Sequence, residues 1–494
     1  MTTSLTMQKI HQFLPESKFV NALPGRLHEP IGNFSTDSRQ IQANDFFIAI
    51  CGEKFDGNQF LPEVFKKGAM GAIASELNCI PPNQPVIMVN DTLKALQEVA
   101  HQWRVEVDPQ VVLVTGSNGK TTVKEMIALI FRQFNGESKT LATQGNFNNE
   151  IGLPLTLLGL QGQHHTAVIE LGMNHPGETK SLSAIACPNI TLINNAQREH
   201  QEFMHTVEAV ANEHGDAILA LPPDGVAIFP HDSEFTELWK KLSGSRQYYD
   251  FALTDAGKKS SAKVTGQWLP NGHLQIHLPK KADGLSSKSI EVRLTTLGDH
   301  NAKNAIAAAA VAWAANVSSD VIMTALQDFV PIAGRMRSHP LPHFSDESCV
   351  IDDTYNANPD SVIAAINVLS KMPGLRWLIL GDMGEVGDKG ELFHQEIGVY
   401  AQQMGVHHLY TTGSLSKCAI DAFTEKMASK KVVEEQLAMH FSEPKLLVKR
   451  LKNDLAILQA SSASSIASIL VKGSRFTKME RVVKCLLNEA SICF

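Results

Sequence analysis

The sequence lacks paired cysteines: its seven cysteines are scattered, and none forms a CxxC motif. Zinc sites and disulfide frameworks need clustered cysteines, so this spacing predicts free thiols in a reducing compartment. The chain also has no apolar run approaching the ~18 residues that cross a membrane, and Met1 to Pro15 lack the pattern of a signal peptide. We therefore expect a cytoplasmic protein with no membrane insertion.

An excess of positive charge is also missing, since the formal net charge is −7 at pH 7. Proteins that bind nucleic acid normally present a basic face to the phosphates, so we expect no nucleic-acid partner. The dinucleotide motif GxGxxG is absent too, which argues against a dinucleotide site. What the chain does have is 494 residues, 43% of them hydrophobic and 19% charged. On the usual length prior this predicts about three folded α/β domains.

The strongest motif follows the apolar residues Val111–Val114 and reads Thr115-Gly116-Ser117-Asn118-Gly119-Lys120-Thr121-Thr122. The apolar run predicts a buried strand, and Val123 to Phe131 continue with helical spacing. Such a strand, glycine-containing turn and helix bind phosphate, because free backbone N–H groups point at the anion. The turn is shorter than a standard P-loop, since Val114 stands where the leading glycine would be.

We therefore predict a nucleotide site that comprises Gly116, Ser117, Asn118, Gly119, Lys120, Thr121 and Thr122. Lys120 is expected to reach the outer phosphates, and the hydroxyl of Thr121 is expected to bind Mg²⁺. The alternative is an ordinary strand-to-helix turn that carries a solvated lysine.

Residues 1–107 are predicted to form a small α/β domain with strands at Phe46–Ile50 and Val86–Val89. A helix is expected from Leu93 to Trp103, capped by Asp91 or Thr92. Two polar turns stand out in this domain, namely Ser35–Arg39 and Gly52–Asn58. Hydroxyls beside an arginine suit a diphosphate, although each turn alone could be a solvated surface turn.

Residues 108–325 are predicted to form the central domain around the phosphate-binding loop. Glu170 ends the apolar strand Ala167–Gly172, and His200 follows the apolar strand Ile190–Ile193 by a few residues. Open α/β sheets bind ligands at the carboxyl ends of their strands. We therefore predict Glu170 and His200 as Mg²⁺ ligands beside Thr121. The alternative for His200 is a structural role, since a lone histidine is more often structural than a metal ligand.

Five asparagines of this domain could contact a ligand. Three lie in the loop Thr143–Pro154, and their amides can both donate and accept hydrogen bonds; a plain connecting loop is the alternative. The other two lie one helical turn apart before an alanine-rich helix, and they could hold a purine edge or cap that helix. These residues are Asn146, Asn148 and Asn149 in the loop, and Asn301 and Asn304 before the helix.

Residues 326–494 restart the alternation of strands and helices, with strands at Val350–Ile351, Trp377–Leu380 and Ile469–Val471. Each strand runs into a polar turn, which is typical of a doubly wound, Rossmann-like sheet with its site along one edge. Residues 424–453 are rich in lysine and glutamate and are predicted to be solvated helix surface.

Taken in order, these motifs resemble those of the Mur ligase family, ATP-dependent enzymes that extend the peptide of the cell-wall precursor. The likeness covers nearly the whole chain. It rests on TDSR at 36–39, TGSNGKTT at 115–122, TQGNFNNEIGLP at 143–154, Glu170, His200, GDHNAKN at 298–304, GRMR at 334–337 and DDTYNANPDS at 352–361. YNANP and VKGSR at 471–475 look most like the branch that adds D-alanyl-D-alanine. The DNPR-type motif of the diaminopimelate-adding branch is absent.

The resemblance implies that UDP-N-acetylmuramoyl-tripeptide and D-alanyl-D-alanine are joined through an acyl phosphate made from ATP, with Mg²⁺ as the metal. It implies three domains that bind UDP, bind ATP and close over ATP, in that order, in a protein we expect to be a monomer. It assigns Thr36, Asp37, Ser38, Arg39, Asp56 and Gly57 to the UDP moiety, Asn301 and Asn304 to adenine, and Arg335 and Asp353 to the nucleotide. Asn146, Asn148, Asn149, Tyr355, Asn356 and Asn358 are assigned to the substrates, and Lys120, Glu170 and His200 to catalysis.

One departure from the family is at His214, where many members carry a carbamylated lysine that helps to hold a second Mg²⁺. A histidine cannot form a carbamate, so either His214, Glu213 or Asp216 binds that metal directly or the second site is weaker. Lys54 and Asn58 also differ, milder changes where relatives often have arginine and histidine. Two alternatives stay open: another amide ligase of this superfamily, such as a folylpolyglutamate synthetase, and a nucleotide-gated binding protein without turnover.

Overall fold

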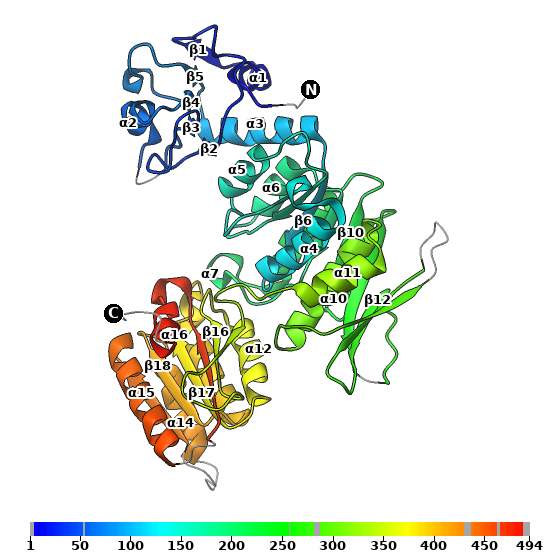
Figure 1. Cartoon of the computed structure of the whole chain (residues 1–494), viewed down its shortest axis with the longest axis vertical. Coiled ribbons are helices and arrows are strands. Elements are labelled where there is room, and N and C mark those ends of the chain that lie inside the picture. The colour runs from blue at the N-terminus through cyan, green and yellow to red at the C-terminus, as the bar shows by residue number, and fades with distance from the viewer. Residues whose placement is uncertain are drawn as a thin grey trace.

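The computed structural model describes residues 4–52, 55–255, 257–280, 287–428, 436–461 and 465–487. It forms three α/β domains, each built on its own sheet, which follow one another along the length of the molecule (Figure 1). The predicted fold class is confirmed. Within the described ranges, no helix is both long enough and apolar enough to span a bilayer.

The N-terminal domain has a five-stranded sheet in the order β1-β5-β4-β3-β2. The predicted strands at 46 and 86 are present, each shorter than predicted. The elements are α1 (Met7–Phe13), β1 (Lys18–Val20), β2 (Phe34–Ser35), β3 (Phe46–Ile48), α2 (Leu61–Lys66), β4 (Gly71–Ala74), β5 (Val86–Met88) and α3 (Thr92–Val107). Asp91 caps α3, because its carboxylate accepts hydrogen bonds from the backbone N–H groups of Leu93 and Lys94.

Helix α3 connects this domain to the next one and belongs to the core of both. Its Leu96, Val99 and Trp103 pack in one continuous cluster with Ile87 of the first sheet and Leu113 of the second. The indole N–H of Trp103 also donates to the carbonyl of Leu160, 3.0 Å away. The predicted boundary after residue 107 thus marks the end of a shared helix, and burial on both sides ties the two domains together.

The central domain has a nine-stranded sheet in the order β14-β13-β12-β11-β10-β9-β6-β8-β7, in which only β13 runs antiparallel to its neighbours β12 and β14. Its strands are β6 (Gln110–Thr115), β7 (Thr140–Ala142), β8 (Thr166–Glu170), β9 (Ile190–Ile193), β10 (Val226–Pro230), β11 (Gln247–Thr254), β12 (Val264–Trp268), β13 (Leu274–Leu278) and β14 (Lys288–Val292). Its helices are α4 (Lys120–Asn135), α5 (Gly152–Leu158), α6 (Glu178–Ala186), α7 (Gln201–Met204), α8 (Val207–Leu219), α9 (Thr236–Ser243), α10 (Asp299–Ala314) and α11 (Ser319–Asp328).

Helices α4 and α10 cover one face of this sheet in a single core. The alanines of α10 from Ala302 to Ala312 are fully buried, and their small side chains let it pack closely on α4 and the strands. Helix α11 packs in the same core through Ile322, Ala325 and Leu326. The predicted boundary after residue 325 therefore cuts a helix, and the central domain continues at least to Asp328.

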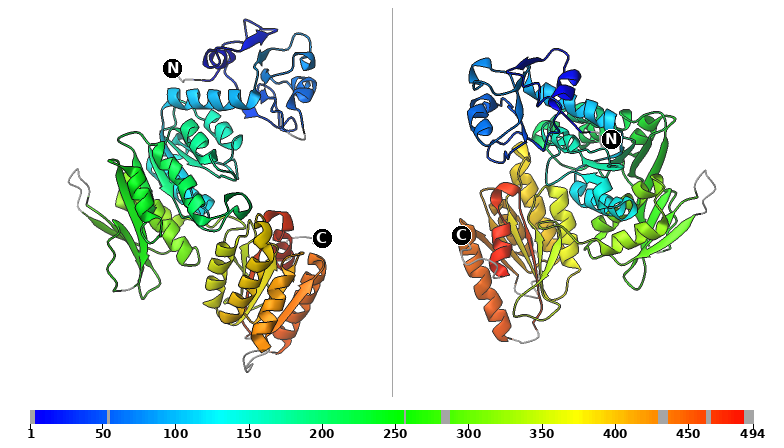
Figure 2. Two further views of the ribbon diagram at one scale, coloured as in Figure 1. Left: turned by 180° about the vertical axis from the view of Figure 1, so that it is seen from behind. Right: turned by 45° about the horizontal axis from the view of Figure 1, so that its top comes forward.

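The C-terminal domain has a six-stranded sheet in the order β15-β16-β20-β17-β18-β19, parallel except for the edge strand β15. Its strands are β15 (Arg337–Pro340), β16 (Cys349–Asp353), β17 (Leu375–Gly381), β18 (His408–Thr412), β19 (Leu437–Phe441) and β20 (Ala467–Lys472). Its helices are α12 (Pro359–Ser370), α13 (Gly390–Gln403), α14 (Lys417–Ala428), α15 (Pro444–Ser461) and α16 (Glu480–Leu486). In the left view of Figure 2 it lies at the opposite end of the molecule from the N-terminal domain.

The prediction that residues 424–453 are solvated helix surface is wrong for much of the segment. Strand β19 lies within it, and Leu447, Val448 and Leu451 of α15 are buried against the sheet. The prediction was based on the many lysines and glutamates of this segment. It overlooked the apolar residues of α15, which recur at helical spacing. Residues 429–435 lie outside the described part of the chain.

Candidate active site

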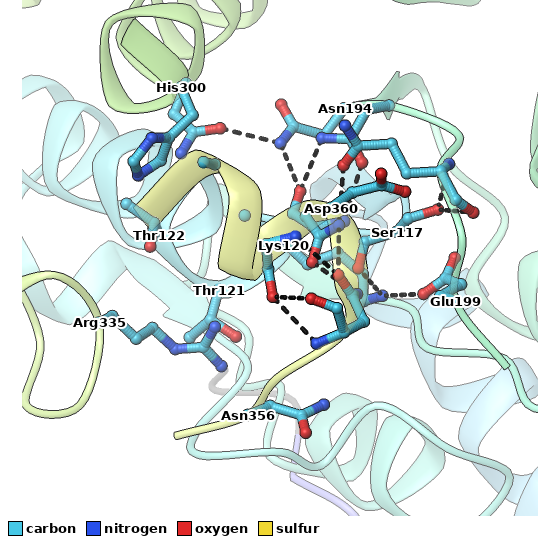
Figure 3. A pocket seen from close by; sticks show the side chains of 18 of the residues that line it. Ser117, Lys120, Thr121, Thr122, Asn194, Glu199, His300, Arg335, Asn356 and Asp360 are labelled. Carbon is cyan, nitrogen blue, oxygen red and sulfur yellow. Dashed lines mark hydrogen bonds and ion pairs between the residues drawn. The ribbon is translucent and has the colours of Figure 1, made fainter. Parts of the chain in front are cut away.

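A cavity of about 1000 Å³ lies between the central and C-terminal domains (Figure 3). Its walls come from segments far apart in the sequence: the 117–122 loop, the loop after β7, the ends of β8 and β9, the start of α10 and three loops of the C-terminal domain. The predicted site residues that line it are Ser117 to Thr122, Asn146, Asn148, Asn149, Glu170, His200, Asn301, Asn304, Arg335, Asp353, Tyr355, Asn356 and Asn358. The fold thus brings these predicted residues together.

The 116–122 loop has the shape of a phosphate site. Gly119 has a φ of +78°, and a side chain there would meet the amide of Asn304 at 2.7 Å, so only glycine fits. Helix α4 begins at Lys120, and no side chain caps its N-terminus. Its first N–H groups therefore face the cavity, where they can bind an anion.

Two asparagines that the sequence analysis did not single out hold this loop in place. Asn195 accepts a hydrogen bond from the backbone N–H of Asn118 at 2.8 Å. Asn194 donates to the carbonyl of Asn118 and to the side chain of Asn304, both at 2.8 Å. Asn304 in turn donates to Asn301 at 3.1 Å. Since these amides bond to protein groups beneath the loop, they fix its backbone; the adenine role of Asn301 and Asn304 stays a prediction.

Lys120 is held by acceptors on both sides of the loop. Its ammonium donates to the carbonyl of Gly116 and lies 3.3 Å from the carboxylate of Glu199, which is 5% exposed. Glu199 also contacts Nε2 of His214 at 2.8 Å, and Nδ1 of His214 lies 2.9 Å from the hydroxyl of Thr115. Burial alone would raise the pKa of Glu199, but Lys120 and His214 hold it well below its usual range. Glu199 is thus a charged partner of Lys120 that the sequence analysis missed.

The same contacts bear on the departure at His214. Both of its ring nitrogens are engaged, one with Glu199 and the other with Thr115. Glu213 accepts the backbone N–H groups of Gly177 and Thr179 at the start of α6, at 2.9 and 2.8 Å. Neither of these residues, nor Asp216, is among the lining of the cavity. The carboxylate that faces the cavity from this side is that of Glu199.

Glu170 has the environment expected of a cation ligand. Its Oε1 accepts a hydrogen bond from Asn148 at 2.8 Å, whereas its Oε2 is buried without any hydrogen-bond partner. A buried carboxylate oxygen without a partner is costly unless a cation binds it, so the residue fits Mg²⁺. Within the described residues no three histidine, cysteine, aspartate or glutamate side chains form a metal cluster. Mg²⁺ does not require such a cluster, because one or two protein carboxylates usually bind it and phosphate and water complete its coordination shell.

His200 lies in the same cavity, but carboxylates surround its ring. Nδ1 lies 2.9 Å from Glu385 of the C-terminal domain, and Nε2 lies 3.8 Å from Glu199. The contact with His200 lowers the pKa of Glu385. His200 therefore links the two domains in this arrangement, and its role as a metal ligand stays a prediction.

Among the loop asparagines, the structure separates different roles. Asn148 holds Glu170, as described above. Asn149 accepts the backbone N–H of Gly152 at 2.9 Å and so closes the turn into α5, which is the role of an ordinary connecting loop. Asn146 is exposed at the wall of the cavity.

The residues predicted to bind UDP lie in the N-terminal domain and do not line this cavity. The guanidinium of Arg39 donates two hydrogen bonds to the carboxylate of Asp37, each 2.8 Å long. These bonds lower the pKa of Asp37 to about 2. Asp56 caps the short helix that starts at Gly57. Gly57 is required there, because a Cβ would lie 2.7 Å from the backbone of Ile50. The predicted set is Thr36, Asp37, Ser38, Arg39, Asp56 and Gly57, and its ligand stays a prediction.

The two departures in the second polar turn have different outcomes. Asn58 is fully buried, donates to Asp56 at 2.8 Å and accepts the backbone N–H of Ser75 at 3.0 Å. It therefore organises the turn from within. Lys54 lies outside the described residues.

Arg198 joins the central domain to the C-terminal domain. Its guanidinium contacts the carboxylates of Asp360 at 2.6 Å and Glu396 at 2.7 Å, and its backbone N–H donates to Asp360 at 2.8 Å. The guanidinium also lies over the ring of Phe393, 5.4 Å from its centre. Nearby, the amide of Asn358 donates to Asn118 at 2.9 Å. A few polar contacts thus set the position of the C-terminal domain against the phosphate loop.

We expect Arg198→Gln to loosen this domain arrangement. The change leaves two half-buried carboxylates without their cation, at a cost of about 1–2 kcal/mol. That free energy shifts the balance between domain positions by roughly 5- to 30-fold, measurable as a broader distance distribution between fluorophores on the two domains. Arg132→Gln is the control, because Arg132 pairs with Glu137 inside one domain. An unchanged distance distribution for Arg198→Gln would contradict the interpretation.

Three family models match the chain in sequence order. They are described as the Mur ligase family catalytic domain over residues 30–104, the Mur ligase middle domain over 114–312 and the Mur ligase glutamate ligase domain over 334–475. Each match falls on one of the three sheets described above.

Individual relatives agree with these matches. UDP-N-acetylmuramoyl-tripeptide--D-alanyl-D-alanine ligase of Escherichia coli is 34% identical over 452 residues, which cover 92% of this chain and 93% of that one. The ligase of the same name from Bacillus subtilis is 32% identical and covers 93% of each chain. A crystal structure of MurF from Acinetobacter baumannii superposes with a TM-score of 0.84 at 30% identity, covering 98% of this chain and 99% of that chain.

Proposed function

The chain belongs to the Mur ligase family, and from this premise we propose that it joins D-alanyl-D-alanine to UDP-N-acetylmuramoyl-tripeptide in an ATP-dependent step of peptidoglycan precursor synthesis. The observation that carries the proposal is the cavity itself. It combines a phosphate-binding loop with Lys120, a buried carboxylate oxygen of Glu170 that lacks a partner, and the Tyr355–Asn358 loop of a second domain.

The first step forms a bond between a carboxylate oxygen of the tripeptide and the γ-phosphorus of ATP, and it breaks the bond from that phosphorus to ADP. The attack brings two anions together, so cations and N–H donors must gather around the transferred group. Lys120 and the N-terminus of α4 supply them here. Thr121, Glu170 and His200 would hold Mg²⁺, which would add positive charge at the phosphates.

In the second step the amine of D-alanyl-D-alanine attacks the carbonyl carbon of the acyl phosphate. The tetrahedral intermediate expels phosphate, the amine loses a proton, and a new amide is left. An acyl phosphate also reacts with water, so the C-terminal domain has to cover the cavity. We assign Arg335 and Asp353 to the nucleotide, and Tyr355, Asn356 and Asn358 to the incoming dipeptide. We assign Asn146 and Asn148 of the 146–149 loop to the tripeptide, and the turns at 36–39 and 56–57 to UDP.

Both alternatives are less well supported. A folylpolyglutamate-type ligase does not explain why a Mur family model matches residues 30–104. A binding protein without turnover is favoured only by His214, and the presence of both Lys120 and Glu170 in the cavity lining counts against it. We also propose that the enzyme acts as a monomer, because one chain supplies every wall of the cavity. We place it in the cytoplasm, where ATP and UDP-linked precursors are made.

Phosphate release tests the proposal, with ATP, UDP-N-acetylmuramoyl-tripeptide and D-alanyl-D-alanine each omitted in turn. We expect release only when all three are present, together with a new amide found by mass spectrometry. Tripeptides with diaminopimelate and with lysine at the third position are compared side by side. Phosphate release that does not depend on the dipeptide would point to another ligase, and no release with any mixture would favour the binding protein.

A further inference from the structure

Two arginines lie over one tyrosine at the rim of the cavity. The guanidinium carbon of Arg335 is 4.0 Å from the centre of the Tyr355 ring, and that of Arg475 is 5.0 Å from it. Arg335 and Tyr355 line the cavity, whereas Arg475 lies just beyond its lining, in the turn after β20. Three loops of the C-terminal domain therefore place two positive charges beside one aromatic ring.

Neither arginine is neutralised inside the protein. Across the part of the chain that is described, no carboxylate lies within ion-pair distance of Arg335 or Arg475. The nearby carboxylates have other partners: Asp353 pairs with Lys472, and Asp352 accepts the backbone N–H of Gly334 at 2.9 Å. Two like charges repel each other at this spacing, so the pair favours an anion from outside.

The loops that carry the two arginines are fixed to each other. The backbone N–H of Tyr355 donates to the carbonyl of Gly334 at 3.0 Å, which ties the tyrosine to the residue before Arg335. On the other side, Ser474 donates to the carbonyl of Ala357 at 3.0 Å and accepts the N–H of Gly384 at 2.7 Å. Because Ser474 is buried and anchored in this way, Arg475 starts from a fixed position. The side chain of Arg475 is exposed, and its contact with the ring of Tyr355 restricts the guanidinium, which lowers the conformational entropy lost when it binds an anion.

We infer that Arg475 binds the terminal carboxylate of the incoming dipeptide, an inference that rests on the proposed function. The dipeptide reacts through its amine, and its carboxylate stays an unchanged anion that only a cation can recognise. The planar fork of a guanidinium matches a carboxylate in two parallel hydrogen bonds. Arg335 lines the cavity and is assigned to the nucleotide, and Arg475, over the same tyrosine ring but outside the lining, is left for the dipeptide.

The position of Arg475 also gives a reason for selecting a dipeptide. Two residues span at most about 7 Å, so the carboxylate of a dipeptide lies further from the reacting amine than that of a single amino acid, by about 3.5 Å, and a cation beyond the cavity lining favours the longer of the two. Phe476, the next residue, is 64% exposed and offers apolar surface beside the carboxylate site for the methyl group of the terminal alanine.

The test compares D-alanyl-D-alanine with D-alanyl-D-alaninamide, which lacks the negative charge, on the wild-type enzyme and on Arg475→Gln. We expect the KM of the wild type to rise roughly 10- to 100-fold from the acid to the amide. Arg475→Gln should raise the KM for the acid by a similar factor and leave the KM for the amide unchanged. Arg475→Lys should recover part of the loss for the acid. The KM values for ATP and for the UDP-linked tripeptide should not change.

Arg481→Gln is the matched control, because Arg481 is an exposed arginine of α16 a few residues further on. An equal rise in KM for acid and amide in Arg475→Gln would overturn the inference, and so would a rise in the KM for ATP alone. Equal KM values for acid and amide in the wild type would overturn it without any variant. Failure of the proposed function looks different, since the wild type would then release no phosphate in response to either dipeptide.

Discussion

Lys120→Ala is expected to lower phosphate release by about 10³-fold while the UDP-linked substrate still binds. The lysine begins α4 and points into the cavity, where its ammonium is held by the carbonyl of Gly116 and by Glu199. ATP offers phosphate oxygens in place of these acceptors. Without the ammonium, the negative charge that builds up on the transferred phosphoryl group loses its nearest side-chain cation.

Single-turnover phosphate release measures this loss, and isothermal titration with UDP-N-acetylmuramoyl-tripeptide measures the binding that should remain. Lys139→Ala is the control, because Lys139 is exposed just beyond the other end of the same helix. The predicted UDP residues lie in the N-terminal domain, away from the cavity lining, so binding and turnover should separate. Turnover within a few-fold of the wild type would refute the role of Lys120 at the phosphates.

Glu170→Gln is expected to lower kcat by about 10²-fold and to raise the Mg²⁺ concentration needed for half-maximal activity. Glutamine keeps the size of the side chain, and its carbonyl oxygen can still accept the hydrogen bond from Asn148. The change therefore removes one negative charge from a buried position and little else. The oxygen Oε2, which has no protein partner, is the atom whose charge the metal loses.

Two measurements follow the metal: a Mg²⁺ titration of phosphate release, and calorimetric binding of ADP with and without Mg²⁺. The variant should bind free ADP as the wild type does but gain less from adding the metal. Glu237→Gln serves as the control, because the Glu237 side chain is 84% exposed on α9. An unchanged Mg²⁺ dependence in Glu170→Gln would show that this carboxylate does not hold the ion.

The sequence predicted the position of a site residue best where that position depends only on residues nearby in the chain. The 115–122 motif requires only a strand, a glycine-containing turn and a helix in succession. Neighbouring residues determine all three. Glu170 was predicted by the same logic, since a lone carboxylate at the end of an apolar strand points to one edge of a sheet. The motif and Glu170 line one cavity, and their roles at the phosphates and the metal stay predictions.

The residues that were missed, or given another role, depend on contacts across long stretches of sequence. Glu199 and Arg198 stand next to His200 in the sequence, yet only His200 was selected. Their importance comes from Lys120, His214 and two carboxylates of another domain. The sequence did offer one signal for these residues, since they follow a strand end next to the phosphate loop. That signal does not identify the residues with which they pair in the folded protein.

By itself the sequence determined the α/β class, the three sheets and the residues of the phosphate loop, because these follow from hydrophobic periodicity and short-range backbone chemistry. Only the tertiary structure decided that α3 belongs to two cores, that Glu199 balances the charge of Lys120, and that Arg335 and Arg475 both lie over the ring of Tyr355. These pairings join groups far apart along the chain. Their free energy depends on distance and burial in the folded state, and neither quantity is encoded in the spacing of residues along the sequence.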